Sequence, residues 1–243
     1  MKQHFLLFLC IVFTTILSAQ NTLQGKVFYT VSLKPFTEKY LDSMFIKLKT
    51  IKSVQPIVRK MFKNSKDVTG VLEFFKNESL YQVENKMKNN GIKGKNMTLS
   101  IAGGNNIYYA NFIKKEYFKQ LNREELLVGL PQIKWTITQE TKKVGDYTCF
   151  KAVSHRKTRK DRPSVKTTAW FTPVIPVSFG PINYFGLPGL ILEVSYENTS
   201  IKATKIILNP SSKIIIKKPR KGKRMTNAAY EEMNRNFFKN LRK

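Results

Sequence analysis

The sequence predicts a mainly β protein of the α+β class. We expect a single curved antiparallel meander sheet, with a helical segment after the first strand and a helix at the C-terminus. Segments with strand-like alternation outnumber helical ones, and turn-forming stretches such as Gly103–Asn106 join them as hairpins. The strand–helix–strand rhythm of a parallel sheet is missing. With 243 residues, of which 42% are hydrophobic, the chain can fill one core.

The first residues have the pattern of a secretory signal peptide. A short basic start is followed by the apolar run Phe5–Leu17, which is too short to span a bilayer, and then by small residues. We therefore expect residues 1–19 to be a signal peptide cleaved near Ala19. Residues 20–217 are expected to form the β-rich domain, and residues 218–243 a basic linker and C-terminal helix.

After removal of the signal peptide, the remaining chain is expected to have neither a membrane span nor a disulfide. It has no further apolar stretch of about 18 residues, so no transmembrane span is expected. Cys149 is the one cysteine after Ala19, so no disulfide partner exists within that chain and the core must hold the fold. A lipid anchor on Cys10 is the alternative to cleavage at Ala19. A lipoprotein would turn polar after that cysteine, whereas this sequence stays apolar.

The N-terminal part combines one strand with a basic helical segment. Val27–Leu33 has strand-like alternation. Thr37 is a suitable N-cap for a helix whose apolar residues recur every three to four positions, and Ile57–Phe62 predicts a short second helix. Residues 43–66 include seven basic side chains and no acid. This charge predicts a solvated helix face; the alternative is a basic amphipathic helix on an anionic surface.

Strand patterns dominate the rest of the chain. Asn85–Asn96 is polar and contains glycine, so it predicts a loop, and Thr226–Leu241 has the apolar spacing of a helix. Lys213–Lys217 is the last predicted strand. The other predicted strands are Val68–Lys76, Ser79–Glu84, Met97–Ala102, Ile107–Ile113, Glu116–Leu121, Leu126–Val128, Ile133–Thr141, Tyr147–His155, Val165–Thr172, Leu190–Tyr196 and Ile201–Leu208.

The sequence lacks the residue spacings of known enzymes and cofactor sites. Cys149 and His155 lie six residues apart on one predicted strand, roughly 20 Å at about 3.3 Å per residue, so they cannot act together as nucleophile and base or share a metal. Glu193 lies inside an apolar strand, where the solvent-facing position of an alternating pattern accounts for it. A catalytic acid is the alternative. We therefore expect no enzymatic activity, no cofactor and no metal.

The positive charge is high, with 43 Lys and Arg against 16 Asp and Glu. Genome composition is one explanation, because most of these residues are Lys and Asn is also abundant. Solvated basic segments are a second, and anionic lipid or lipopolysaccharide is a third. Few aromatic residues interleave the basic runs, so no nucleic-acid partner is expected. The candidates for an anionic surface are Arg156, Lys157, Arg159, Lys160, Arg162, Lys217, Lys218, Arg220, Lys221, Lys223 and Arg224.

The segment 170–194 differs from the rest of the chain because prolines and glycines alternate with apolar residues. Leu187–Leu190 suits a type II turn, with Pro188 at the second position and Gly189 at the third. A loop this stiff and apolar either closes the end of a core or displays a rigid contact surface. The candidate binding or docking residues are Trp170, Phe179, Pro181, Tyr184, Phe185, Gly186, Leu187, Pro188, Gly189, Leu190, Ile191 and Glu193.

Gly186–Ile191 spells GLPGLI, and the chain resembles the GLPGLI family of exported Bacteroidota proteins over roughly residues 68–208. The basic stretch 156–166 is a departure, because it replaces a shorter Arg-Gly-Arg-like connection. The family has no established activity, so the resemblance implies export and a fold rather than a function. The further segments similar to the family pattern are Phe74–Tyr81, Val144–Ala152, Ala169–Thr172, Ile175–Pro176 and Gly180–Pro181.

The order of strand, helices and meander is similar to the half-barrel of LolA/LolB-type lipoprotein carriers, whose concave apolar face holds acyl chains. The leading hypothesis is therefore a non-enzymatic exported protein, periplasmic or associated with the outer membrane, that binds an apolar or amphiphilic ligand or an unknown envelope partner. The alternative is an accessory or scaffold subunit of an outer-membrane complex that docks through the GLPGLI loop. An enzyme with Glu193 as catalytic acid is the third hypothesis.

Overall fold

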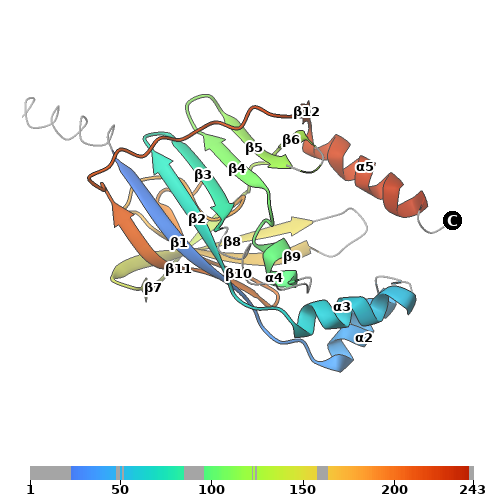
Figure 1. Ribbon diagram of the computed structural model, residues 1–243. Coiled ribbons are helices and arrows are strands. Elements are labelled where there is room, and N and C mark those ends of the chain that lie inside the picture. Colours follow the sequence, from blue (N-terminus) through green and yellow to red (C-terminus); the bar gives the residue numbers. More distant parts are fainter. Residues whose placement is uncertain are drawn as a thin grey trace, which may run out of the picture.

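The computed structural model describes residues 23–47, 50, 52–84, 96–121, 123, 125–157 and 164–240. The expected signal peptide, residues 1–19, lies outside this part of the chain. Figure 1 shows one large twisted sheet with the longer helices beyond its borders and one short helix beside its strands. No helix within the described ranges is both long and apolar enough to cross a membrane.

All strands of the described chain belong to one mainly antiparallel sheet, which confirms the predicted fold class. The order is β12-β6-β5-β4-β3-β2-β1-β11-β10-β9-β8-β7, and the sheet is open because β12 and β7 are its edges. The strands are β1 (Gln24–Leu33), β2 (Val68–Phe75), β3 (Glu78–Val83), β4 (Ile107–Asn111), β5 (Glu116–Leu121), β6 (Leu126–Gly129), β7 (Thr136–Val144), β8 (Tyr147–Lys157), β9 (Ser164–Thr172), β10 (Leu190–Tyr196), β11 (Thr199–Leu208) and β12 (Lys223–Met225).

Strand β1 lies in the middle of the sheet and joins two meanders. Val27 of β1 lies between Leu72 of β2 and Ile206 of β11, and both pairings are antiparallel. The strands β1–β6 form one meander and β7–β11 the other. The sheet therefore consists of two meanders and not of the single one expected. Alternation along the chain predicts each strand, but it does not predict which distant strands pair.

The alternation of β1 explains its central place. Val27, Tyr29 and Val31 are completely buried, and the side chains between them point to the opposite face. Valine and tyrosine suit a pleated surface that is covered by other side chains. The main core lies on this face and takes side chains from both meanders.

Helices lie where the sequence predicts them at both ends of the fold. The helix α2 (Glu38–Lys47), the 3-10 helix η1 (Lys52–Val54) and the helix α3 (Gln55–Lys63) connect β1 to β2, and α5 (Asn227–Asn240) follows β12. Thr37 is the expected cap of α2. Its hydroxyl accepts a 3.2 Å hydrogen bond from the Tyr40 N–H, and its carbonyl accepts one from the Leu41 N–H at 3.1 Å.

Two predicted strands are wrong. Residues 97–102 contain the helix α4 (Met97–Ile101), because the Asn96 side chain accepts a 3.0 Å hydrogen bond from the Thr98 N–H and caps a helical turn. The last strand is not at residues 213–217 but at β12, which runs parallel to β6. The strand β7 begins at Thr136, three residues after the predicted start at Ile133, so Trp135 precedes the strand.

The C-terminal strap, residues 209–222, crosses the sheet from the end of β11 to β12 (Figure 1). The Ile214 N–H donates to the Gln24 side chain at 2.8 Å, and the Gln120 side chain donates to the Lys221 carbonyl at 2.9 Å. Ile216 packs against a second, smaller hydrophobic cluster. This cluster consists of Tyr109, Phe118 and Leu127.

Candidate functional site

The GLPGLI segment lies at the end of the main core and fills it. Leu187 is 1% exposed, and Leu190 and Ile191 are completely buried. Gly186 and Pro188 are the exposed positions, so the leucine and isoleucine side chains of the segment give a docking partner no contact. The other loop candidates divide in the same way: Phe179, Pro181, Phe185 and Gly189 are buried, and Tyr184 is half-buried.

Hydrogen bonds tie this loop to itself and to a distant tryptophan. The Gly186 N–H donates to the Ser178 carbonyl at 2.9 Å. The indole Nε1 of Trp135 donates to the Phe185 carbonyl at 3.0 Å. Trp135 therefore holds the loop from outside, a role that the predicted strand face did not indicate.

Gly189 supplies the backbone freedom that the predicted turn needs, but the turn is of a different type. Its φ is +155°, and a Cβ there would lie 2.2 Å from the Thr172 carbonyl oxygen. A type II turn would be closed by a hydrogen bond from the Leu190 N–H to the Leu187 carbonyl. Instead the Gly189 N–H donates to Leu187 at 2.8 Å, and the Leu190 N–H donates to Ile175 at 3.0 Å. The start of β10 is thus held by the loop itself.

Aromatic rings connect the loop to both β2 and β5. The Phe185 ring stacks on Tyr117, with centroids 4.7 Å apart and planes 12° apart. Phe179 packs against Phe74 at 6.0 Å and Phe112 at 5.3 Å. Such pairs contribute about 0.5–1.5 kcal/mol each beyond their burial. Together with the buried leucines, they make the loop a closure of the core.

Glu193 and Trp170 are partners across the β9–β10 pair, and Lys142 of β7 contacts both. The Lys142 Nζ lies 2.7 Å from the Glu193 Oε1 and 4.4 Å from the centroid of the Trp170 ring. All three are half-buried. Within the described ranges, no group of His, Cys, Asp and Glu could hold a metal ion. The geometry is that of a cross-strand ion pair over an aromatic ring, which stabilises the sheet.

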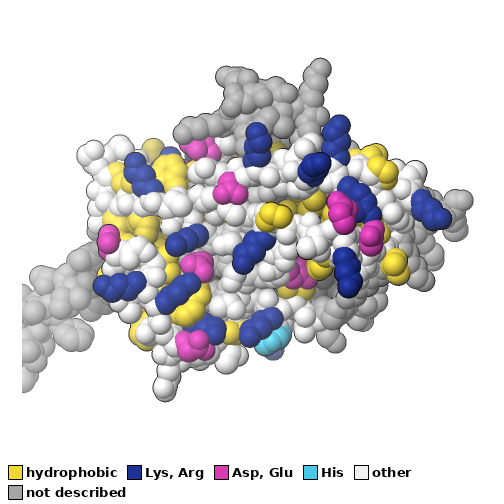
Figure 2. Space-filling view, turned by 90° about the horizontal axis from the view of Figure 1, so that it is seen from below, with side chains coloured by type: hydrophobic (Ala, Val, Ile, Leu, Met, Phe, Trp, Pro, Cys, Tyr) yellow, Lys and Arg dark blue, Asp and Glu magenta, His cyan; other side chains and the backbone are white. Residues whose placement is uncertain are grey.

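The basic run after residue 216 is partly committed to ion pairs. Lys218 lies 2.6 Å from Glu116, Lys221 lies 2.6 Å from Glu125, and Arg224 lies 3.9 Å from Glu116. Figure 2 shows one face of the molecule, where Lys and Arg side chains are spread widely among acidic ones rather than gathered in one patch. All candidates of the run are exposed except the half-buried Lys218, and the exposed ones are Lys217, Arg220, Lys221, Lys223 and Arg224. Arg156 and Lys157 end β8, and Arg159, Lys160 and Arg162 lie outside the described residues.

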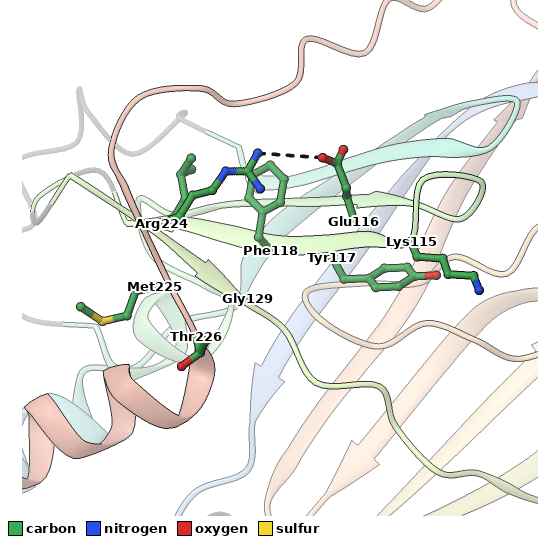
Figure 3. Close-up of a pocket in the computed structure, with 9 residues that line it drawn as sticks. Lys115, Glu116, Tyr117, Phe118, Gly129, Arg224, Met225 and Thr226 are labelled. Carbon is green, nitrogen blue, oxygen red and sulfur yellow. Dashed lines mark ion pairs between the residues drawn. The ribbon is translucent and has the colours of Figure 1, made fainter.

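A pocket of about 370 Å³ opens between β5, β6 and the residues around β12 (Figure 3). Its volume falls in the range of roughly 300–1,000 Å³ that is usual for small-molecule sites. Its lining combines aromatic and aliphatic side chains with charged ones. The lining residues are Lys115, Glu116, Tyr117, Phe118, Leu127, Gly129, Arg224, Met225 and Thr226.

The strand pairing explains how these residues meet. In β5, Glu116 and Phe118 point to one face of the sheet and Tyr117 to the other. The parallel pairing of β12 with β6 places Arg224 beside Leu127. In Figure 3, Arg224 extends over Phe118 toward Glu116. The pocket thus exists only because the strap returns the C-terminal residues to this edge.

The charges in the pocket are unevenly balanced. The Lys218 ammonium donates to Glu116 at 2.6 Å, and this hydrogen bond is the main reason that the pKa of Glu116 lies below its usual value. Arg224 makes only the longer 3.9 Å contact with the same carboxylate. Because Lys218 already neutralises Glu116, the guanidinium of Arg224 retains donors for an anion at the mouth of the pocket.

Arg224 is the one pocket residue that the sequence analysis predicts as a functional candidate. Five of the other eight belong to β5 and β6, where their alternation is that of ordinary strands. The signal that was missed is the apolar Met225 directly after the basic run, which marks a segment that packs rather than a free tail. Its parallel partner, β6, is almost a hundred residues earlier in the chain.

Comparisons with known proteins support the β-rich fold and find a family match for one segment of the sequence. A family model described as a protein of unknown function, Porph_ging, matches residues 154–193, which include the GLPGLI residues. No curated protein matches the sequence. A structure of PNGF-II in the P21 space group has 14% identity and a TM-score of 0.52, and covers 87% of this chain and 33% of that chain. A second structure of PNGF-II, in the C2 space group, has 14% identity, a TM-score of 0.51, and coverage of 87% and 32%.

The similarity to PNGF-II shows a shared β-rich fold. This chain spans about a third of the length of the solved chains that it matches. At 14% identity, the similarity assigns no functional role of a PNGF-II residue to a residue of this chain.

Proposed function

We propose that this chain is an exported protein of the Bacteroidota cell envelope, related to the GLPGLI proteins, that binds an amphiphilic ligand without transforming it chemically. The single observation that carries the proposal is the 370 Å³ pocket, in which an apolar wall adjoins a guanidinium group. The sequence pattern of residues 1–19 supports export to the periplasm or the outer membrane.

The ligand site is assigned to this pocket rather than to the face of the sheet. Buried loop residues already occupy the end of the core, among them Ile175, Phe179 and Leu187. An acyl chain held as in a half-barrel carrier would have to displace them. The pocket needs no such displacement, because the space of about 370 Å³ beside Phe118 and Arg224 is not filled by the protein's own side chains.

The chemistry of the pocket selects an apolar body with an anionic group. Phe118 and Leu127 supply apolar surface, and Arg224 supplies a donor that matches a carboxylate or phosphate. A fatty acid or a phospholipid fragment therefore fits better than a neutral or cationic amphiphile. No cofactor is required.

Docking through the GLPGLI loop is not proposed as the function. A docking surface needs exposed apolar side chains, and in this loop Leu187, Leu190 and Ile191 are buried. The exposed Gly186 and Pro188 supply too little surface for a specific interface.

Calorimetric titration with decanoate, decanol and decyltrimethylammonium tests the proposal. We expect decanoate to bind most tightly, and Arg224→Ala to weaken it by about tenfold or more, because a charged hydrogen bond is lost. Lys223→Ala is the matched control, since Lys223 is an exposed neighbour that does not line the pocket. Equal affinity for the three amphiphiles, or equal effects of the two substitutions, would overturn the proposed site.

A further inference from the structure

The helical arm, residues 38–66, extends away from the sheet between β1 and β2 (Figure 1). It has a small core of its own. Leu41 and Phe45 are buried, and the Arg59 guanidinium lies 5.0 Å from the centroid of the Phe45 ring. The Phe62 ring meets Phe36 edge to face at 4.7 Å. The arm is thus a defined unit whose outer surface is set by the two short helices.

That outer surface carries large apolar side chains. Ile46 of α2 is 80% exposed and Ile57 of α3 is 52% exposed. The helix α3 buries none of its residues completely, although it is strongly amphipathic. Four of the ten exposed large hydrophobic residues in the described chain belong to the arm: Tyr40, Ile46, Val54 and Ile57.

Lysines flank these exposed isoleucines. Lys60 follows Ile57 by three positions, so the two side chains lie on neighbouring turns of one helix face. Lys39 precedes Ile46 by seven positions, which is two helical turns, so these two also share a face. An apolar side chain beside a long cationic one is the arrangement of helices that lie in a membrane interface.

The charge of the arm is strongly positive. Residues 38–66 contain eight basic and two acidic side chains, a net charge of +6. Both acids, Glu38 and Asp42, form ion pairs with Arg59. The arginine therefore neutralises part of the acidic charge, and the lysines give the arm its net positive charge.

We propose that the helical arm docks on an anionic phospholipid bilayer. Charge complementarity selects an anionic surface. The exposed isoleucines select a bilayer over a soluble polyanion, because a polysaccharide or nucleic acid has no acyl region in which to bury them. This surface is separate from the pocket at β5, β6 and β12, so the proposal stands whether or not that pocket binds a ligand.

Vesicle co-sedimentation tests this surface directly. The chain from Gln20 onward keeps every described residue and removes the apolar N-terminal run, which would itself bind lipid. We expect it to bind vesicles of phosphatidylcholine mixed with phosphatidylglycerol, and to bind pure phosphatidylcholine at least about tenfold more weakly. Binding should weaken as salt is added, since salt screens the charges.

Substitutions divide the apolar from the ionic part of the interaction. The double variant Ile46→Ser with Ile57→Ser should weaken vesicle binding about tenfold, because two inserted side chains are lost. The matched control is Ile113→Ser with Ile215→Ser, at positions 74% and 70% exposed but outside the arm. Lys60→Gln with Lys63→Gln should also weaken binding, against Lys202→Gln with Lys205→Gln on exposed positions of β11.

The variant with both arm isoleucines replaced distinguishes binding to a bilayer from binding to a soluble polyanion. Dextran sulfate serves as a soluble polyanion, and we expect the arm isoleucine variant to bind it as the unsubstituted chain does. Vesicle binding that is unchanged in the arm isoleucine variant, or equally weakened in the control variant, would overturn the proposal. All four variants alter exposed positions, so their far-ultraviolet circular dichroism should match that of the unsubstituted chain.

Discussion

The hydroxyl of Tyr29 donates a 2.7 Å hydrogen bond to the carbonyl oxygen of Ile191, 162 residues further along the chain. Tyr29 is in the central strand, and Ile191 is the last residue of the GLPGLI segment. The register between β9 and β10 shifts directly after Ile191, so a side chain satisfies a carbonyl at an irregular point of the ladder. Tyr29 thus connects the two meanders at the loop that closes the core.

Substitution of Tyr29 by phenylalanine removes this hydrogen bond and leaves the buried carbonyl of Ile191 without the hydroxyl. We expect Tyr29→Phe to lower the free energy of unfolding by about 1–3 kcal/mol. Urea unfolding followed by fluorescence measures it. The matched control is Tyr81→Phe, because the Tyr81 hydroxyl is buried and, in the described chain, has no hydrogen-bond partner. The idea fails if Tyr81→Phe costs as much as Tyr29→Phe.

Gly189 cannot be replaced by any residue with a Cβ without strain. Gly189→Ala would meet the Thr172 carbonyl oxygen at 2.2 Å with φ at +155°, so we expect a loss of at least about 3 kcal/mol from steric overlap and backbone strain together. Gly104→Ala is the comparison, because Gly104 also has positive φ but nothing within 4 Å of the added atom. That change should cost about 1–2 kcal/mol. Equal losses in urea unfolding would contradict the geometry.

Local patterns were sufficient to predict most elements of this fold. The strand β8 and the helix α5 follow from side-chain periodicity, and Thr37 from capping chemistry. The strand that the pattern predicts at residues 97–102 is wrong, because so short an alternation fits one helical turn as well as a strand, and the Asn96 cap decides between them. The β1–β11 pairing joins residues far apart in the chain, which no local pattern encodes.

The candidate site was harder to predict than the fold. The residue pattern marks the proline- and glycine-rich loop as unusual, but it fits both a core closure and an exposed contact surface. In the structure, Leu187 and Phe179 are buried and close the core. The pocket was missed, except for Arg224, since it depends on the parallel pairing of β12 with β6. A three-residue strand at the end of a basic run has too little alternation to be distinguished from a solvated tail.

Cys149 should be chemically inert in the folded protein. Burial raises the pKa of its thiol to about 11, and the side chain is completely buried. At about pH 8, the thiolate fraction is then roughly 200-fold lower than for a free cysteine of pKa about 8.5. In a Cys10→Ser background, labelling by a thiol reagent should be slow in buffer and fast in concentrated urea. Rapid labelling of the folded chain would show that the thiol is accessible.

The ion pair of Glu116 with Lys218 should make stability depend on pH. Because the Lys218 hydrogen bond lowers the pKa of Glu116 in the folded state, the pair stabilises above the unfolded carboxyl pKa of about 4.3 and is lost as pH falls through the lowered folded value. We expect Glu116→Gln to cost about 0.2–1 kcal/mol near neutral pH. Unfolding in urea at several pH values should show this difference vanish in acid. A difference that is constant with pH would assign the effect to packing.

The strap should stabilise the fold through Ile216 and not through its neighbour. Ile216 packs against Tyr109, Phe118 and Leu127, whereas Ile215 points outward and is exposed. Truncation of a partly buried isoleucine removes about 1–2 kcal/mol of apolar burial, so Ile216→Ala should lower the free energy of unfolding by that amount. Ile215→Ala should change it by less than about 0.5 kcal/mol. Because the strap positions Arg224, Ile216→Ala should also weaken decanoate binding at the pocket. If both alanine variants unfold at the same urea concentration, the strap does not hold this edge of the sheet.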